Sequence, residues 1–151
     1  MQISKKTRYA LRALFELTLR EGEGSIKIAD VAKSQAIPQK FLETILVQLK
    51  QAGYVRSHRG SEGGYVLSVD PGILTVGDIV RVMQGPTEPV DCLGLQPSES
   101  CPLNLDCPFL PMWNEVQEAI NNVYDSTTFK SLVALKAAKK NTLERKVAAK
   151  R

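Results

Sequence analysis

Apolar positions at helical spacing predict two helices at the start of the chain. The first apolar set falls three or four residues apart, and the two glycines of EGEGS end it: Tyr9, Ala10, Ala13, Leu14 and Leu17. The stretch IADVAKSQA continues the pattern after the glycines, with Ile28, Val31 and Ala32 on one face. The sequence therefore predicts a first helix, a break and a short second helix.

A longer amphipathic segment begins after Ile37-Pro38. Proline disfavours helical backbone in the residue before it and suits a first helical turn, so this dipeptide predicts a tight junction between helices. The side chains expected to face inward, before Gly53 ends the helix, are Phe41, Leu42, Ile45, Leu46, Leu49 and Ala52. The polar side chains left on the outside are Gln39, Lys40, Glu43, Thr44 and Gln48.

The stretch YVRSHRGSEGGYVLS has two β-rich runs around a glycine-containing turn and predicts a hairpin. Two helices, a turn, a third helix and a hairpin form a winged helix-turn-helix, a mainly α (α+β) fold. The outward face of the third helix then fits a DNA major groove, and Arg56, His58 and Arg59 reach flanking phosphates or the minor groove. A module of this shape that binds no nucleic acid is the alternative.

Helical patterns resume beyond the hairpin. TVGDIVRVMQG predicts a short linking helix, in which the Thr75 hydroxyl can cap the first turn. Further on, an apolar set spaced three, four and three residues apart resembles the seam of a helix pair: Trp113, Val116, Ile120 and Val123. Because one helix-turn-helix unit covers only a half-site of DNA, a homodimer paired through this helix is expected. A helix that lies on its own domain is the alternative.

A last helix is expected from about residue 128 to 139, with an apolar set that could clasp the same interface: Phe129, Leu132, Val133 and Leu135. The predicted organisation is a DNA-binding region over residues 1–70, a linking helix over 71–90, a cysteine loop over 91–108, dimerisation helices over 109–139 and a disordered basic tail over 140–151.

Charge is distributed unevenly along this organisation. Residues 1–70 carry 11 Lys or Arg against 7 Asp or Glu, residues 71–137 carry 3 against 8, and residues 138–151 carry 6 against 1. Basic side chains gain from counterion release at phosphates, so this distribution is expected if only the N-terminal part touches a polyanion. A solvated surface with accidental asymmetry is the alternative.

Size and composition favour a soluble protein. The chain has 151 residues, 43% of them hydrophobic, which suffices for one packed domain or a small domain with an appendage. Charges interrupt every apolar stretch, so we expect a cytoplasmic protein without a membrane partner. An enzyme is least expected, because a lone histidine and no phosphate loop, Ser/His/Asp or HExxH arrangement leave no catalytic pair.

All three cysteines, Cys92, Cys101 and Cys107, lie in the loop DCLGLQPSESCPLNLDCP. Three is an odd number, so intramolecular disulfides cannot use them all, and the loop has too few apolar residues to bury them as a core. An iron-sulfur cluster, redox-active thiols, zinc and no function remain open. The spacings of eight and then five residues differ from the CxxC pairs of zinc ribbons.

Three stretches together resemble the Rrf2 family of bacterial transcription regulators: SKKTRYALRALFELTL, IADVAKSQAIPQKFLETILVQLKQAGYVRSHRGSEGGYVLS and TVGDIVRVMQG, followed by the three cysteines. The resemblance covers about residues 1 to 137. It implies a homodimeric winged-helix repressor or activator that senses iron-sulfur status, redox stress or nitric oxide. The sensor would be an iron-sulfur cluster, 2Fe-2S or 4Fe-4S, held by Cys92, Cys101 and Cys107. A cluster-free regulator of this fold that senses by thiol oxidation or through a partner enzyme is the alternative.

The resemblance also places residues in the DNA interface. By position, Glu43 falls in the recognition helix, and Ser57, Arg59 and Gly60 fall in the wing. Together with the outward face of the third helix, the expected DNA-binding set is Gln39, Lys40, Glu43, Thr44, Arg56, Ser57, Arg59 and Gly60.

The chain departs from the family at the fourth ligand of the cluster. Leu110 stands where the iron-sulfur type has a histidine, three residues after the last cysteine, and Arg8 stands where the nitric-oxide sensor type has an aspartate. Asp106 is a candidate fourth ligand, but it also stands where a helix N-cap is needed before Pro108, and the cap is favoured. His58 in the wing is expected to meet phosphate or solvent rather than a metal.

Overall fold

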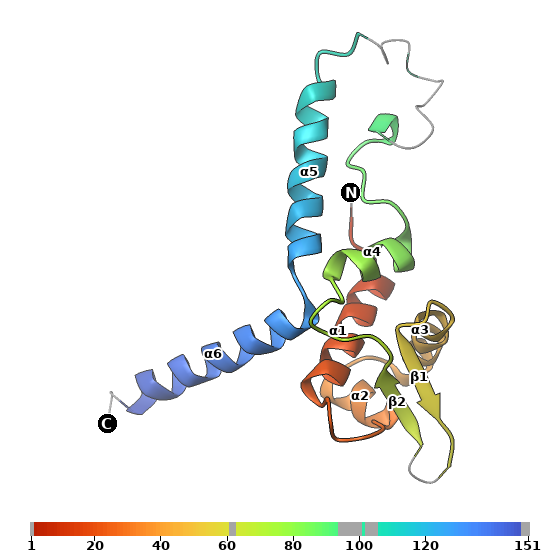
Figure 1. The fold of residues 1–151 in the computed structure, drawn as a ribbon, viewed down its shortest axis with the longest axis vertical. Helices are drawn as coiled ribbons and strands as arrows, with labels where there is room; N and C mark the ends of the chain where they lie inside the picture. The colour runs from red at the N-terminus through yellow and green to blue at the C-terminus, as the bar shows by residue number, and fades with distance from the viewer. Residues whose placement is uncertain (1, 61–62, 94–100, 102–105, 149–151) are drawn as a thin grey trace.

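The computed structural model describes residues 2–60, 63–93, 101 and 106–148, with side chains as far as Lys139 in the last helix. Its elements are α1 (Lys5–Leu19), α2 (Ile28–Ser34), α3 (Gln39–Gln51), β1 (Val55–His58), β2 (Gly64–Leu67), α4 (Val76–Gln84), the 3-10 turn η1 (Asp91–Leu93), α5 (Leu110–Ser126) and α6 (Phe129–Ala148). This order confirms the predicted helix-turn-helix with a wing, a linking helix and two C-terminal helices (Figure 1).

Helix α1 lies at the centre of the winged domain. The Ser4 hydroxyl accepts a hydrogen bond of 3.0 Å from the Thr7 amide and caps the first turn. The helix packs against α2, α3, α4 and α6. Its buried apolar side chains are the predicted Ala10, Ala13, Leu14 and Leu17. The periodicity of the sequence therefore identified the core face of this helix.

Helix α3 buries most of the apolar face that the sequence predicted. Its fully buried side chains are Leu42, Ile45, Leu46 and Leu49. Phe41 is 42% exposed and Ala52 is the exposed residue that ends the helix, so the prediction that these two face the core is wrong. Phe41 lies at the edge of the apolar stripe, where its ring meets the ring of Tyr9 edge-on with centroids 5.8 Å apart.

The predicted hairpin is confirmed, and it is attached to the helical domain. Strands β1 and β2 are antiparallel, with Val55 opposite Leu67. The Tyr65 amide donates to the Ile26 carbonyl over 2.8 Å, and the Ile26 amide donates back to the Tyr65 carbonyl over 3.0 Å. A side chain at Gly64 would collide with the Ile26 carbonyl, so this close approach requires glycine.

Helix α4 begins with the cap that the sequence predicted. The Thr75 hydroxyl accepts from the Asp78 amide over 3.1 Å, and the Asp78 carboxylate accepts from the Thr75 amide over 2.9 Å, which completes a capping box. Leu74, the residue before Thr75, contacts the start of α6, because the Phe129 amide donates to the Leu74 carbonyl. The Phe129 side chain is fully buried in the core of its own chain rather than placed at an interface.

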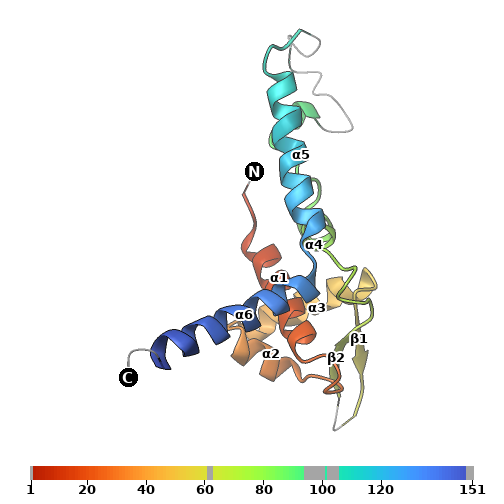
Figure 2. The ribbon, with the colours of Figure 1, turned by 60° about the vertical axis from the view of Figure 1, so that its left-hand side comes forward.

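Helices α5 and α6 extend from the winged domain in different directions (Figures 1 and 2). No described side chain of α5 is buried. Helix α6 continues to Ala148, so the tail expected to be disordered over 140–151 is helical through that residue. Helix α6 as a whole is rich in Ala and Lys and lacks Gly and Pro, a composition with high intrinsic helix propensity.

Candidate nucleic-acid interface and cysteine connection

The outward face of α3 is formed by side chains that the domain leaves uncovered. As the sequence predicted, it exposes Gln39, Lys40, Glu43 and Thr44. Gln39 Nε2 donates to Glu43 Oε1 over 3.5 Å, a long bond that groups of a binding partner can replace. Gln48 was expected on this face, but it is half-buried and its Nε2 donates to the Val82 carbonyl of α4 over 3.1 Å. That part of the prediction is wrong.

A tight turn between α2 and α3 sets the direction of this face. Ala36 has a φ of 48°, in the left-handed region, and the Ile37 amide donates to the Ala32 carbonyl over 2.9 Å. Ile37 is buried, and Pro38 stands directly before the first residue of α3. The junction that the sequence predicted therefore holds the two helices as a helix-turn-helix, with the second helix presented to solvent.

The hairpin lies on the same side of the domain as α3 in both views (Figures 1 and 2). Lys50 Nζ of α3 donates to Ser57 Oγ of β1 over 2.7 Å, which ties the hairpin to the helix. Arg59 and Gly60 are exposed after β1. Gly60 has a φ of 112°, and its carbonyl accepts from the Gly63 amide over 2.9 Å. The α3 face and the Arg59 guanidinium are thus available to one external partner.

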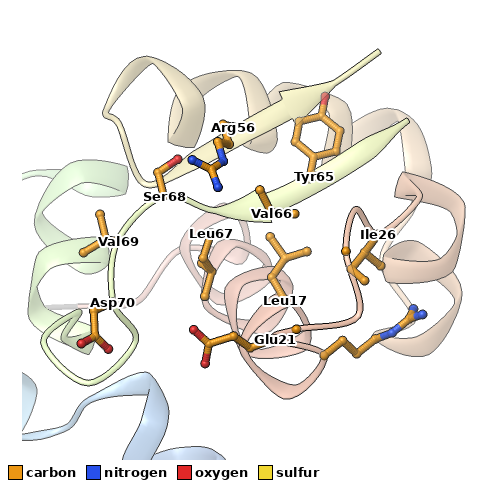
Figure 3. A pocket seen from close by; sticks show the side chains of 13 residues that line it. Leu17, Glu21, Ile26, Arg56, Tyr65, Val66, Leu67, Ser68, Val69 and Asp70 are labelled. Carbon is orange, nitrogen blue, oxygen red and sulfur yellow. The ribbon is translucent and has the colours of Figure 1, made fainter. Parts of the chain in front are cut away.

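Arg56 lies on the other face of the hairpin from Ser57, as strand alternation requires. Figure 3 shows its side chain beside a cavity of about 480 Å³ between the hairpin and the end of α1. The carboxylates of Glu21 and Asp70 also lie at this cavity. Because carboxylates repel phosphates, the cavity itself does not suit nucleic acid, and the assignment of Arg56 to DNA stays a prediction.

The cysteines lie along the connection between α4 and α5. Cys92 is in η1, and Cys107 lies shortly before the first residue of α5. Element η1 and the start of α5 lie at the end of α5 that points away from the winged domain (Figures 1 and 2). Cys92, Cys101 and Cys107 are half-buried free thiols. Within the described residues, which omit 94–100 and 102–105 of the loop, no three His, Cys, Asp or Glu side chains are close enough to hold a metal. The thiols have the chemistry of an iron-sulfur site, but the described chain does not gather them.

Asp106 does not cap α5. The helix begins at Leu110, and its N-cap residue, Phe109, makes no side-chain capping bond. Asp106 is exposed in a turn several residues earlier, too far along the chain to accept from the first free amides, so the predicted cap is wrong. Pro111 stands in the first helical turn, where a missing amide donor costs little. The assignment of Asp106 as a fourth ligand stays a prediction.

Polar contacts fix the base of α5 on α4. Arg81 Nη2 donates to Asp125 Oδ1 over 2.6 Å, and this hydrogen bond raises the pKa of Arg81. Thr87, which is 3% exposed, donates to Asn121 Oδ1 over 2.9 Å. These two bonds join α5 to α4 and to the segment that follows α4. The sequence carried no signal for these pairs, because their members are 34 or more residues apart.

Comparison with known proteins identifies the family of this chain. The model of the Rrf2 family, described as iron-dependent transcriptional regulators, matches residues 3–135. The chain belongs to the Rrf2 family.

Relatives within the family include two kinds of regulator. The HTH-type transcriptional regulator CymR of Bacillus subtilis is 37% identical over 134 residues, which are 89% of this chain and 91% of that protein. IscR of Yersinia pestis is 30% identical over 133 residues, 88% of this chain and 79% of that protein. Among solved structures, CymR (YrzC), the global cysteine regulator of B. subtilis, has a TM-score of 0.74 at 34% identity, with 89% of this chain and 98% of that chain covered. T. potens IscR has a TM-score of 0.71 at 30% identity, with 93% and 90% covered.

Rrf2 membership makes this protein a transcriptional regulator rather than an enzyme, and the solved relatives confirm its fold. Both CymR and IscR regulators are similar to it, so the family does not by itself identify what the cysteines bind. In the part of the chain that the structure describes, no helix is long and apolar enough to cross a bilayer.

Val47, Lys50 and Gln51 are further exposed residues of the α3 face that the expected DNA-binding set left out. Val47 is 51% exposed, although an apolar side chain in an amphipathic helix is normally counted with the core. Its position relative to Glu43 and Thr44 was the available signal, because residues three and four apart share a helix face.

Proposed function

We propose that this Rrf2 protein regulates transcription as a homodimer bound to a double-stranded DNA operator. Helix α3 enters the major groove, and the end of the hairpin meets flanking phosphates or the minor groove. The observation that carries the proposal is the exposed polar face of α3 beside the hairpin, with the residues Gln39, Lys40, Glu43, Thr44, Ser57, Arg59 and Gly60. Lys40 and Arg59 supply charge for phosphates, and the uncharged and acidic side chains can read base edges.

Pairing through α5 is supported by the apolar surface that the chain leaves uncovered there. Val123 is 62% exposed, and Trp113, Val116 and Ile120 are only half-buried. These four residues follow the spacing of a helix seam, so the same helix of a second copy would cover them. A dimer also supplies two α3 helices, as an operator with two half-sites needs.

Selection from a random double-stranded DNA library, followed by titration and sedimentation, tests the dimeric DNA-binding function. We expect dimers whose affinity for the enriched duplex falls steeply with salt. Val123→Glu should yield monomers that bind weakly, because a buried unpaired carboxylate opposes pairing. Ile73→Glu is the matched control, since Ile73 is 69% exposed and lies outside α5. A monomeric parent protein, or a library without enrichment, would contradict the proposal.

Cys92, Cys101 and Cys107 form the proposed sensing site, and an iron-sulfur cluster, 2Fe-2S or 4Fe-4S, is its first candidate ligand. Three thiols on one connection are the donors that such clusters take, and the family description refers to iron. A bound cluster would supply redox and ligand-exchange chemistry. Cys92 lies in η1 and Cys107 lies shortly before α5, and Asp125 near the other end of α5 is bonded to α4.

Thiol oxidation without a cluster is the second candidate. The three thiols are free in the described chain, and one similar structure is described as a global cysteine regulator. Sensing through a partner enzyme is the other cluster-free alternative. In either case the cysteines, rather than the α3 face, carry the signal.

Anaerobic purification with iron and sulfide assays separates the two candidates. Coloured, sulfide-containing protein that loses DNA affinity or gains it on exposure to air or nitric oxide would support the cluster. Colourless, sulfide-free protein after reconstitution would overturn it. Peroxide should then change the affinity of the parent protein but not of Cys92→Ala, and an equal response in both would also overturn thiol sensing. Ser34→Ala, away from the cysteines on α2, is the control variant.

A further inference from the structure

An apolar residue occupies the centre of the outward face of α3. A helix turns about 100° per residue, so Val47 lies about 40° past Glu43 and about 60° before Thr44 around the helix axis. Glu43 and Thr44 are exposed, and so is Lys40, which shares this arc. Val47 is 51% exposed. Val47 therefore lies within the same arc, about one turn beyond Glu43 and Thr44, and its side chain has no hydrogen-bonding group.

Phe41, the other exposed apolar residue of α3, is in a different situation. It lies about 160° from Glu43 around the axis, outside this arc. Its ring packs against Tyr9, so its exposure reflects its place at the edge of the core. Val47 instead faces the direction from which a DNA groove would approach α3.

We propose that Val47 contacts the 5-methyl group of a thymine and sets the base preference at one position of each half-site. This inference rests on the proposed placement of α3 in the major groove. Base edges in that groove present hydrogen-bonding groups and one apolar group, the thymine methyl. Only that group gains from contact with an isopropyl side chain, because the contact releases water from both apolar surfaces.

Replacement of single thymines by deoxyuridine tests the contact, because it removes the methyl and keeps the base pair. The probe is the duplex enriched from a random library by the parent protein. Burial of one methyl group contributes about 0.8 kcal/mol, so removal of the contacted methyl should weaken binding about fourfold for each half-site. Val47→Ala should lose this sensitivity at the same thymine and keep its preferences at other positions. Alanine is a good helix former, so α3 should remain folded.

Ile73→Ala is the matched control, since Ile73 is an exposed apolar residue outside α3 and should retain the response to deoxyuridine. Two results would overturn the proposal: a parent protein that tolerates deoxyuridine at every thymine, or a Val47→Ala variant that keeps the parent's response. A library in which the parent enriches no duplex would instead overturn DNA binding itself, so the two failures are distinguishable.

Discussion

Replacement of Phe129 by alanine should destabilise the protein more than a substitution on the exposed face of α3. The Phe129 side chain has 0% exposure and is the largest among the fully buried side chains. Removal of a buried aromatic ring costs about 3–5 kcal/mol, the loss of burial plus the cavity left behind. Two hydrogen bonds fix the backbone at the start of α6, because the Phe129 amide donates to the Leu74 carbonyl and the Lys130 amide donates to the Pro71 carbonyl. The site therefore cannot collapse easily, which places the cost in the upper part of that range.

Urea unfolding followed by circular dichroism measures this cost at one fixed protein concentration, since the stability of the proposed dimer depends on concentration. Phe129→Leu should cost less, because most of the volume remains. Ile73→Ala is the surface control, since Ile73 is 69% exposed, with an expected change of about 0.5 kcal/mol or less. A Phe129→Ala variant within about 1 kcal/mol of the parent would refute the assignment of this ring to the core that joins α6 to the winged domain.

Three further outcomes are expected. Thr75→Ala should cost about 1 kcal/mol of stability, seen as a fall in Tm of about 2–4 °C, whereas Thr75→Ser should keep the cap and the Tm. Arg59→Ala should weaken operator binding by about 1–3 kcal/mol in a titration, and an unchanged affinity would remove the hairpin end from the interface. Glu43→Ala should relax base preference, because a carboxylate accepts a hydrogen bond from cytosine N4 but is repelled by phosphates. The measurement compares its affinities for operators varied one base at a time, and a preference equal to that of the parent would leave Glu43 without a role in reading bases.

Local patterns were sufficient to predict the elements of the winged domain. The buried residues of α3 follow its helical period, and the Thr75 cap is a short-range contact within one turn. Glycines and prolines placed the breaks between helices. These features depend on residues close in sequence, whose side chains and backbone interact whatever the rest of the chain does.

Contacts between distant residues explain two of the predictions that failed, those for Gln48 and Phe129. Gln48 looked like a surface residue, yet its amide donates to a carbonyl of α4 that is 34 positions away. Phe129 matched an interface pattern, but the core of its own domain had room for its ring. Asp106 was a sound local cap candidate, and the chain began its helix further on. Periodicity identifies which face of a helix is apolar, but it does not identify the surface that covers it.

Helix α4 connects the two regions assigned to sensing and to DNA. Arg81 of α4 bonds Asp125 at the base of α5, and the next residue, Val82, accepts a bond from Gln48 of α3. One turn of α4 thus contacts both α5 and α3. A change at the cysteines alters operator affinity only if it favours one arrangement of these contacts over another. The Arg81–Asp125 and Gln48–Val82 contacts, together with the Thr87–Asn121 bond, are contacts through which such a difference can act.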